Sequence, residues 1–277
     1  MVIDNTNLLQ KIEQGLSDIR ELMANDAVME MFTKDFSFRF CWSSNAIEGN
    51  TLSLDETIDL IEYDEVRAGK PFSHYQDAKN LYQAISKSML PFHPETISEA
   101  WIQKNNGIIM GTNGAYRVTQ NFVGSVIEAV YWPPKPEEVP ALMEQYLQTV
   151  NFEAKDLSTL MQKVAESHVK FERIHPFKDG NGRVGRMILN QQLINHGVLP
   201  VTIGPAGSYR RSFKIYDKNK DLSKLIHEIC KEELKAIERV KELGQQLKHP
   251  GLDEQIASAK SQQKKTPAPR TAKENER

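Results

Sequence analysis

One stretch of twelve residues, 175–186, constrains the fold of this chain more than any other part of its sequence. It reads His-Pro-Phe-Lys-Asp-Gly-Asn-Gly-Arg-Val-Gly-Arg. Glycine and asparagine adopt open or left-handed backbone conformations more readily than other residues, so the N–H groups of Gly180, Asn181 and Gly182 can converge on an anion. Apolar residues then recur at helical spacing: Val184, Met187, Ile188 and Leu193. The sequence therefore predicts an anion-binding turn that opens a helix packed on one face.

The side chains of this stretch predict phosphate binding and proton transfer. A helix N-terminus attracts anions, and Arg183 and Arg186, three residues apart, add positive charge. Asp179 suits Mg²⁺, which takes one or two protein carboxylates and completes its shell with phosphate oxygens and water. His175 can accept a proton at neutral pH, because an unperturbed imidazole titrates near ~6.5. Read alone, the histidine and the glycine-rich helix start are also compatible with structural roles.

These residues resemble the Fic family signature, His-Pro-Phe-x-(Asp/Glu)-Gly-Asn-Gly-Arg-x-x-Arg, at every defined position. The resemblance implies transfer of AMP from ATP to a Ser, Thr or Tyr hydroxyl of a protein, with release of pyrophosphate. It implies that His175 deprotonates the hydroxyl and that Asp179 binds Mg²⁺. The phosphates would be held by Gly180, Asn181, Gly182 and Arg183 (α and β) and by Arg186 (γ). Related Doc toxins, which phosphorylate, carry Lys where this chain has Gly182, and this difference favours AMP transfer.

A second match lies upstream, at residues 41–50, which read Cys-Trp-Ser-Ser-Asn-Ala-Ile-Glu-Gly-Asn. Ser44 and Glu48 are four residues apart, so on a helix they share one face, and Gly49 favours helix termination. The pair resembles the Fic inhibitory motif (Ser/Thr)-x-x-x-Glu-(Gly/Asn). The resemblance implies that Glu48 forms a strong, geometrically specific ion pair with Arg186 and keeps it from the γ-phosphate. By itself, this short pattern also fits an ordinary helix end.

A β-hairpin is expected between the two matches. Gly124 and Ser125 stand between two apolar pairs, which is a hairpin turn signal. In Fic proteins this hairpin is a flap, whose exposed edge aligns the target segment as an added strand. Nucleotide contacts are expected from the flap and from the segment after the signature helix: Val123, Gly124, Ser125, Val126, Phe213 and Asn219. That second segment is shorter than in the family, so transfer of UMP or GMP stays open.

Helical periodicity through most of the chain predicts an all-α domain with one core of roughly 240 residues, in the Fic fold that the resemblance implies. Amphipathic helices are expected over 8–22, 157–171 and 222–237. We divide the chain into an N-terminal helical region, 1–110, and a Fic core, 111–247. The inhibitory helix is expected at about 35–49 and the flap at about 118–132. His168 is expected in the core rather than as a ligand.

Composition limits the partners and the compartment. The last thirty residues, 248–277, are rich in polar residues and are expected to be a disordered tail. Seven basic and four acidic residues give this tail +3, and the whole chain carries −2, too little positive charge to indicate nucleic-acid binding. Neither a membrane span nor a signal peptide is indicated, so a cytoplasmic location is expected. Cys41 and Cys230 are expected to be reduced packing residues, and Mg²⁺ is the only metal expected.

The sequence thus predicts a self-inhibited protein adenylyltransferase with ATP as substrate and Mg²⁺ as cofactor. A rival enzymatic reading is removal of AMP, in which Glu48 positions a hydrolytic water. A rival of another class is an inactive scaffold whose flap binds peptide strands, although the intact His175, Asp179 and Arg186 argue against it. A target protein docked on the flap is expected, while self-modification and homo-oligomer formation stay open.

Overall fold

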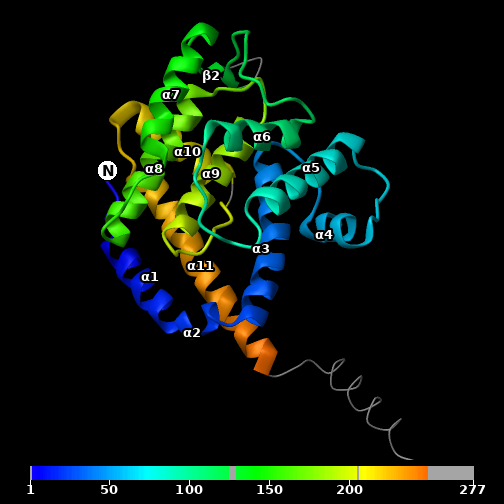
Figure 1. Cartoon of the computed structure of the whole chain (residues 1–277), viewed down its shortest axis with the longest axis vertical. Coiled ribbons are helices and arrows are strands. Elements are labelled where there is room, and N and C mark those ends of the chain that lie inside the picture. The colour runs from blue at the N-terminus through cyan, green and yellow to red at the C-terminus, as the bar shows by residue number, and fades with distance from the viewer. Residues whose placement is uncertain (1, 125–128, 205, 249–277) are drawn as a thin grey trace, which may run out of the picture.

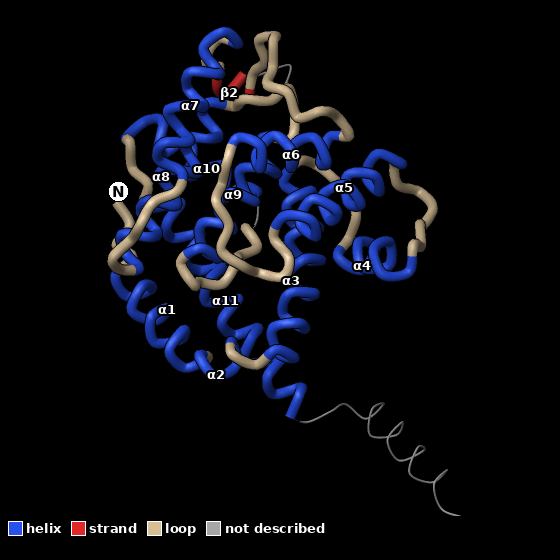
Figure 2. Tube along the Cα trace, in the orientation of Figure 1, coloured by secondary structure: helices blue, strands red, loops and turns tan. Residues whose placement is uncertain are grey.

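Helices build nearly all of this protein, for which a computed structural model describes residues 2–124, 129–204 and 206–248. The α-helices are α1 Thr6–Asp18, α2 Arg20–Met23, α3 Asp26–Ile47, α4 Leu54–Tyr63, α5 Phe72–Ser88, α6 Glu99–Met110, α7 Val139–Val150, α8 Leu157–Ile174, α9 Asn181–Asn195, α10 Ala206–Asn219 and α11 Ser223–Lys248. A short 3-10 turn, η1 Pro136–Glu138, precedes α7. The expected all-α class is confirmed (Figure 1, Figure 2). No described helix is both long and apolar enough to cross a membrane.

Capping side chains set where the N-terminal helices begin. Asn25 accepts a hydrogen bond from the N–H of Val28 at the start of α3, and Ser53 and Glu56 form a capping box at the start of α4. The single helix expected over residues 8–22 is wrong. It is divided into α1 and α2 at Ile19, which is fully buried and has φ −97° and ψ 6°, outside the helical region.

The signature helix α9 lies in the core. Nearly every one of its residues is buried, and it packs against α8, α6 and α3 (Figure 1). The long α11 closes the other side of the fold against α1, α3 and α8. Cys41 and Cys230 are buried and free, as expected. Because α9 is enclosed by helices from both halves of the chain, its N-terminus is positioned by residues distant in sequence.

The strands form one short antiparallel pair, β1 Val123–Gly124 and β2 Ala129–Tyr131. Val123 lies opposite Tyr131, and Gly124 lies opposite Ala129 after a register shift. Gly124 therefore belongs to a strand rather than to the expected turn, because the pairing continues through it. Ser125 and Val126, also expected at the flap, lie outside the described residues, as do residues 249–277 of the expected tail.

Candidate active site

The signature stretch forms the loop between α8 and α9, residues 175–180, and the first turns of α9, residues 181–186. Helix α8 ends at His175, whose φ of 50° places a non-glycine residue in the left-handed region. Such a backbone persists only where its surroundings hold it. The N–H of His175 donates to Phe171 O at 3.0 Å, and the buried ring of Phe177 lies 5.6 Å from that of Tyr116. The loop is thus anchored on both sides of the histidine.

His175 is neutral at physiological pH. Burial lowers its pKa to about 4, although the backbone carbonyl of Glu172 has the opposite effect. Its Nδ1 lies 3.4 Å from that carbonyl oxygen. In the tautomer that carries the proton on Nδ1, the carbonyl accepts this N–H and Nε2 keeps a free lone pair. His175 can therefore take a proton from a hydroxyl group.

The backbone N–H groups of Gly180, Asn181 and Gly182, which we call the nest, lie at the start of α9. Gly180 has φ 80°, and a Cβ there would lie 2.9 Å from both Asn106 Nδ2 and Met110 Sδ, so conformation and space both require glycine. The Asn181 side chain is buried and bonds both backbone groups of Phe177, accepting from its N–H at 2.8 Å and donating to its oxygen at 2.9 Å. The Asn181 side chain thus braces the loop, and its backbone N–H is the group it offers to an anion.

Arg186 is fully buried and is bound by the C-terminal end of α3. Its Nε donates to Ser44 Oγ at 2.8 Å, and its Nη2 donates to Ser44 O at 2.9 Å and to Glu48 Oε1 at 2.7 Å. The Glu48 side chain is 40% exposed and that of Arg186 is 1% exposed. Burial opposes ionisation of Glu48, but the Arg186 charge lowers its pKa overall. The ionised Glu48 carboxylate thus extends from the protein surface to the buried guanidinium of Arg186.

Gly182 is explained by this ion pair. The residue lies inside α9 and does not have a left-handed φ, so the expectation that it adopts an open backbone is wrong. A Cβ at this position would overlap with Glu48 Oε1 and lie 3.0 Å from Arg186 Nη1. Glycine is needed because the carboxylate approaches the helix backbone closely.

Arg183 extends from α9 to α5 and α6. Its Nη1 donates to Asp77 Oδ1 at 2.9 Å, and its Nη2 lies 3.2 Å from Met110 Sδ and 3.8 Å from Asp179 Oδ1. Both signature arginines are therefore paired with acidic residues that precede them by more than a hundred positions in the sequence.

Asp179 stands at the mouth of the nest. Its side chain is 70% exposed, and its Oδ1 accepts the N–H of Gly180 at 2.5 Å. The described residues contain no group of three or more His, Cys, Asp or Glu side chains that could enclose a metal ion. Mg²⁺ needs no such group where phosphate oxygens and water complete its shell, so a single carboxylate beside the nest fits that ion.

The segment before β1 ties the strand pair to the signature loop. Arg117 is buried, its Nε donates to His175 O at 2.9 Å, and its backbone N–H donates to Pro176 O at 2.9 Å. Asn121 Nδ2 donates to Phe177 O at 3.1 Å. Strand β1 consequently begins beside the loop that carries the histidine.

Phe213 and Asn219, the two nucleotide contacts expected after the signature helix, lie in different surroundings. Phe213 packs against His168, with ring centroids 5.8 Å apart. His168 is buried, as expected, and its Nε2 lies 2.7 Å from the Tyr209 hydroxyl. Asn219, at the end of α10, lines a cavity with Ser158. Ser158 and His175 lie at opposite ends of α8, which corresponds to ~25 Å at the helical rise, so Asn219 is not brought to the signature loop.

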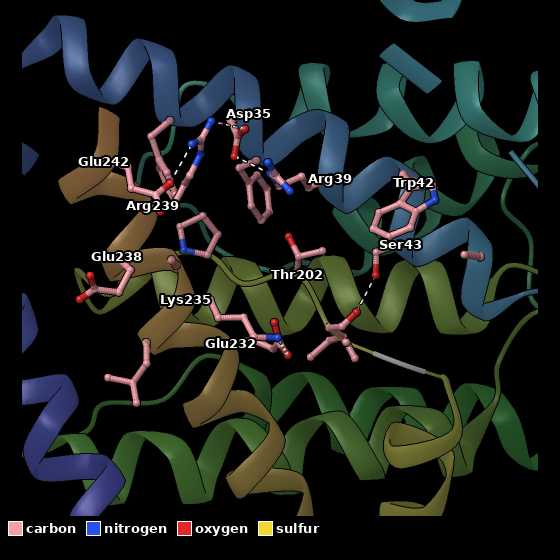
Figure 3. Close-up of a pocket in the computed structure, with 18 of the residues that line it drawn as sticks. Asp35, Arg39, Trp42, Ser43, Thr202, Glu232, Lys235, Glu238, Arg239 and Glu242 are labelled. Atoms are coloured by element: carbon pink, nitrogen blue, oxygen red, sulfur yellow. Dashed lines mark hydrogen bonds and ion pairs between the residues drawn. The ribbon is translucent and has the colours of Figure 1, made fainter. Parts of the chain in front are cut away.

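A cavity of about 850 Å³ lies beside α3, away from the ion pair. Figure 3 shows side chains of α3 and α11 around it. Ser43 lines the cavity and donates to Ile203 O at 2.5 Å, whereas neither Ser44 nor Glu48 lines it. No residue of the signature loop lines it either, so this cavity is separate from the His175 site.

Sequence reasoning missed three charged residues of the site: Asp77, Arg117 and Arg210. Arg210 donates to the carbonyl of Ile47 at the end of α3. These contacts join residues 58 to 163 positions apart. No local pattern identifies such residues, because each acts through a partner that only the packing of the helices brings near.

Known proteins share this domain. Residues 96–193 match the family model described as the Fic/DOC family. "Protein adenylyltransferase Fic" of Nematostella vectensis is 30% identical over 203 residues, and "Protein adenylyltransferase fic-1" of Caenorhabditis elegans is 27% identical over 204. Each match covers 71% of this chain but only 46% and 39% of the respective relative. The chain thus spans less than half the length of these curated relatives.

Solved structures share the fold. A Fic domain containing signaling protein from Bacteroides thetaiotaomicron has a TM-score of 0.71 at 25% identity, covering 83% of this chain and 96% of that one. Fic-1 from C. elegans has a TM-score of 0.72 at 24% identity, covering 86% and 72%. The family match also includes the whole signature loop, from His175 to Arg186. Signature, family match and shared fold agree that this chain belongs to the Fic/DOC family.

Proposed function

We propose that this chain is a protein adenylyltransferase, which transfers AMP from ATP to a Ser, Thr or Tyr hydroxyl of a protein, and that Glu48 restrains it. The arrangement at the start of α9 carries the proposal: a neutral His175 precedes the nest, and Arg186 follows it with Glu48 bound at 2.7 Å. The similar curated proteins bear the name protein adenylyltransferase.

In the proposed reaction, His175 Nε2 takes the proton of the target hydroxyl while the hydroxyl oxygen attacks the α-phosphorus. The new oxygen–phosphorus bond forms as the bond from the α-phosphorus to the bridging oxygen breaks, and pyrophosphate leaves with the electron pair. The backbone N–H groups of the nest and the charge of Arg186 stabilise the developing negative charge. Asp179 would hold Mg²⁺, which when bound would neutralise phosphate charge.

The geometry of Arg186 supports the proposed inhibition. Nη2 already donates to Ser44 O and Glu48 Oε1, so a phosphate oxygen can bind Nη2 only in place of the carboxylate. While Glu48 stays, the γ-phosphate lacks this contact and ATP cannot adopt the pose that places its α-phosphorus in line with the hydroxyl.

Labelled ATP tests the proposal. Glu48→Gly should label itself or proteins of a cell lysate well above wild type. Adding His175→Ala to that variant should reduce labelling by ~10²–10⁴-fold while ATP still binds, because only the base is lost. Adding Arg186→Ala instead should also remove the gain. Equal labelling by wild type and Glu48→Gly would refute the inhibition, and labelling that survives His175→Ala would refute the base.

The proposed docking site for the target is the edge of the β1–β2 pair. Arg117 and Asn121 tie this pair to the signature loop, which supports a role in presenting a hydroxyl to His175. Target labelling should then decrease when an unlabelled extended peptide from the same target is added in excess.

Removal of AMP is a second candidate function, favoured by the ionised and 40% exposed carboxylate of Glu48. Such a carboxylate can position a water molecule near a phosphate. Protein labelled by Glu48→Gly should then lose AMP when wild type is added and keep it when Glu48→Gly is added. Stable labelling in both mixtures would leave transfer as the sole activity.

A further inference from the structure

Arg183 lies in a nearly closed slot with one strong partner. Its side chain is 5% exposed, and its ion pair with Asp77 of α5 measures 2.9 Å. The other neighbours hold it weakly: Met110 Sδ is a soft acceptor, and Asp179, 3.8 Å away, is 70% exposed. The Asp77 carboxylate is thus the main group that fixes this guanidinium.

The bond to Asp77 also sets the direction of the guanidinium. Arg183 Nε is buried and has no hydrogen-bond partner among the described residues, so it does not help to orient the group. Because the guanidinium is planar and rigid, one anchored N–H determines where the others point. The segment of α5 that carries Asp77 is held against α6, since Asn80, one turn later, donates to Ile109 O of α6 at 3.1 Å.

The fixed guanidinium faces the site. Met110 Sδ, which Nη2 contacts, would also lie 2.9 Å from a Cβ on Gly180, so the slot adjoins the nest. The charge of Arg183 also contributes to the lowered pKa of Glu48. The Arg183 charge is therefore close both to the nest and to the carboxylate that covers Arg186.

We propose that Asp77 is a positioning residue, which holds the Arg183 guanidinium at the nest so that it can bind nucleotide phosphate. The inference rests on the proposed function, because it takes Arg183 as a phosphate ligand. Asp77 acts through Arg183, and its removal leaves a buried guanidinium that is free to turn away from the nest.

The test uses the full chain carrying Glu48→Gly, with ATP binding measured by calorimetry and AMP transfer measured by kinetics, both with Mg²⁺ present. Asp77→Asn keeps the shape and removes the charge, and it should raise the Kd and KM for ATP about tenfold while kcat changes much less. Asp77→Glu restores the charge and should recover most of the affinity. Asp59→Asn on α4, which breaks an exposed ion pair with Arg67, is the matched control and should leave both constants unchanged.

A double-mutant cycle separates positioning from general damage. In a chain that already carries Arg183→Gln, Asp77→Asn should weaken ATP binding no further. An equal loss with and without Arg183 would overturn the proposal, and so would tighter ATP binding by Asp77→Asn, since Asp77 would then compete with phosphate. Failure of the proposed function looks different: ATP binding would follow the predicted pattern, yet no variant would transfer AMP.

Discussion

Replacing Glu172 with glutamine should change how the stability of this protein depends on pH. Glu172 lies on α8, and its Oε1 is buried with no hydrogen-bond partner among the described residues. A Cβ on Gly185 would lie 2.5 Å from that oxygen, so α9 covers it closely. Burial raises the pKa of Glu172 to about 7; the Arg186 charge opposes this effect and the Glu48 charge adds to it.

The sign and the size of the effect follow from this pKa. A carboxyl group whose pKa is higher in the folded state binds more protons when folded, so the stability that it contributes is lost as pH rises from 4.5 to about 7. The shift from 4.5 to about 7 corresponds to ~3 kcal/mol at ~1.4 kcal/mol per pKa unit. This is an upper limit, because Glu172 as a residue is partly exposed and solvent reduces the penalty.

Urea unfolding of wild type and Glu172→Gln at pH 5 and pH 8 measures the effect. Between these values, the free energy of unfolding of wild type should fall relative to the variant by up to ~2.5 kcal/mol. Glu166→Gln, on the exposed side of the same helix, measures what the substitution itself costs. A difference between wild type and Glu172→Gln that is equal at both pH values would refute the reasoning.

Further substitutions test the packing of the site and its metal. Gly185→Ala should lower the free energy of unfolding by about 1–3 kcal/mol, because its Cβ would meet Glu172 Oε1 at 2.5 Å. Gly207→Ala is the control: no atom lies within 4 Å of its Cβ, so the free energy of unfolding should rise by up to ~1 kcal/mol. Ser44→Ala leaves the buried Nε of Arg186 without its acceptor and should cost about 1–3 kcal/mol in the same urea titration. Asp179→Ala should remove the Mg²⁺ dependence of ATP binding in calorimetry, and EDTA should abolish AMP transfer by Glu48→Gly; metal-independent transfer would contradict the role of Asp179.

The contact between α3 and α9 could be predicted from the sequence because both partners lie in recognisable patterns. Ser44 and Glu48 resemble the Fic inhibitory motif and Arg186 completes the Fic signature, and this resemblance implies the contact across 138 residues. Asp77 could not be predicted in this way. It lies in an amphipathic helix with no signature of its own. Only the packing of α5 against α3 and α6, which both also contact α9, brings it to Arg183.

Phe213 and Asn219, the expected nucleotide contacts after the signature helix, show a second limit of sequence reasoning. Periodicity can place Phe213 on the inner face of a helix, and the ring does pack against His168. Periodicity does not predict the direction in which that helix runs. Because α10 continues to Asn219, it carries this residue to the cavity at the start of α8 rather than to the nest.

The positions of Ser44 and Glu48 on α3 support the proposal that Glu48, and not Ser44, is the residue released from Arg186. Ser44 lies inside the helix and is buried, whereas Glu48 is the C-cap residue, 40% exposed, and Gly49 follows it with φ 97°. When the Glu48 side chain rotates away, Arg186 keeps both bonds to Ser44, and one hydrogen of Nη2 becomes available to a phosphate. Release of the Glu48 side chain therefore requires neither the unwinding of a turn of α3 nor the exposure of Arg186. Glu48→Gly should accordingly change AMP transfer far more than it changes the melting temperature. A large fall in melting temperature would mean instead that the ion pair holds α3 in place.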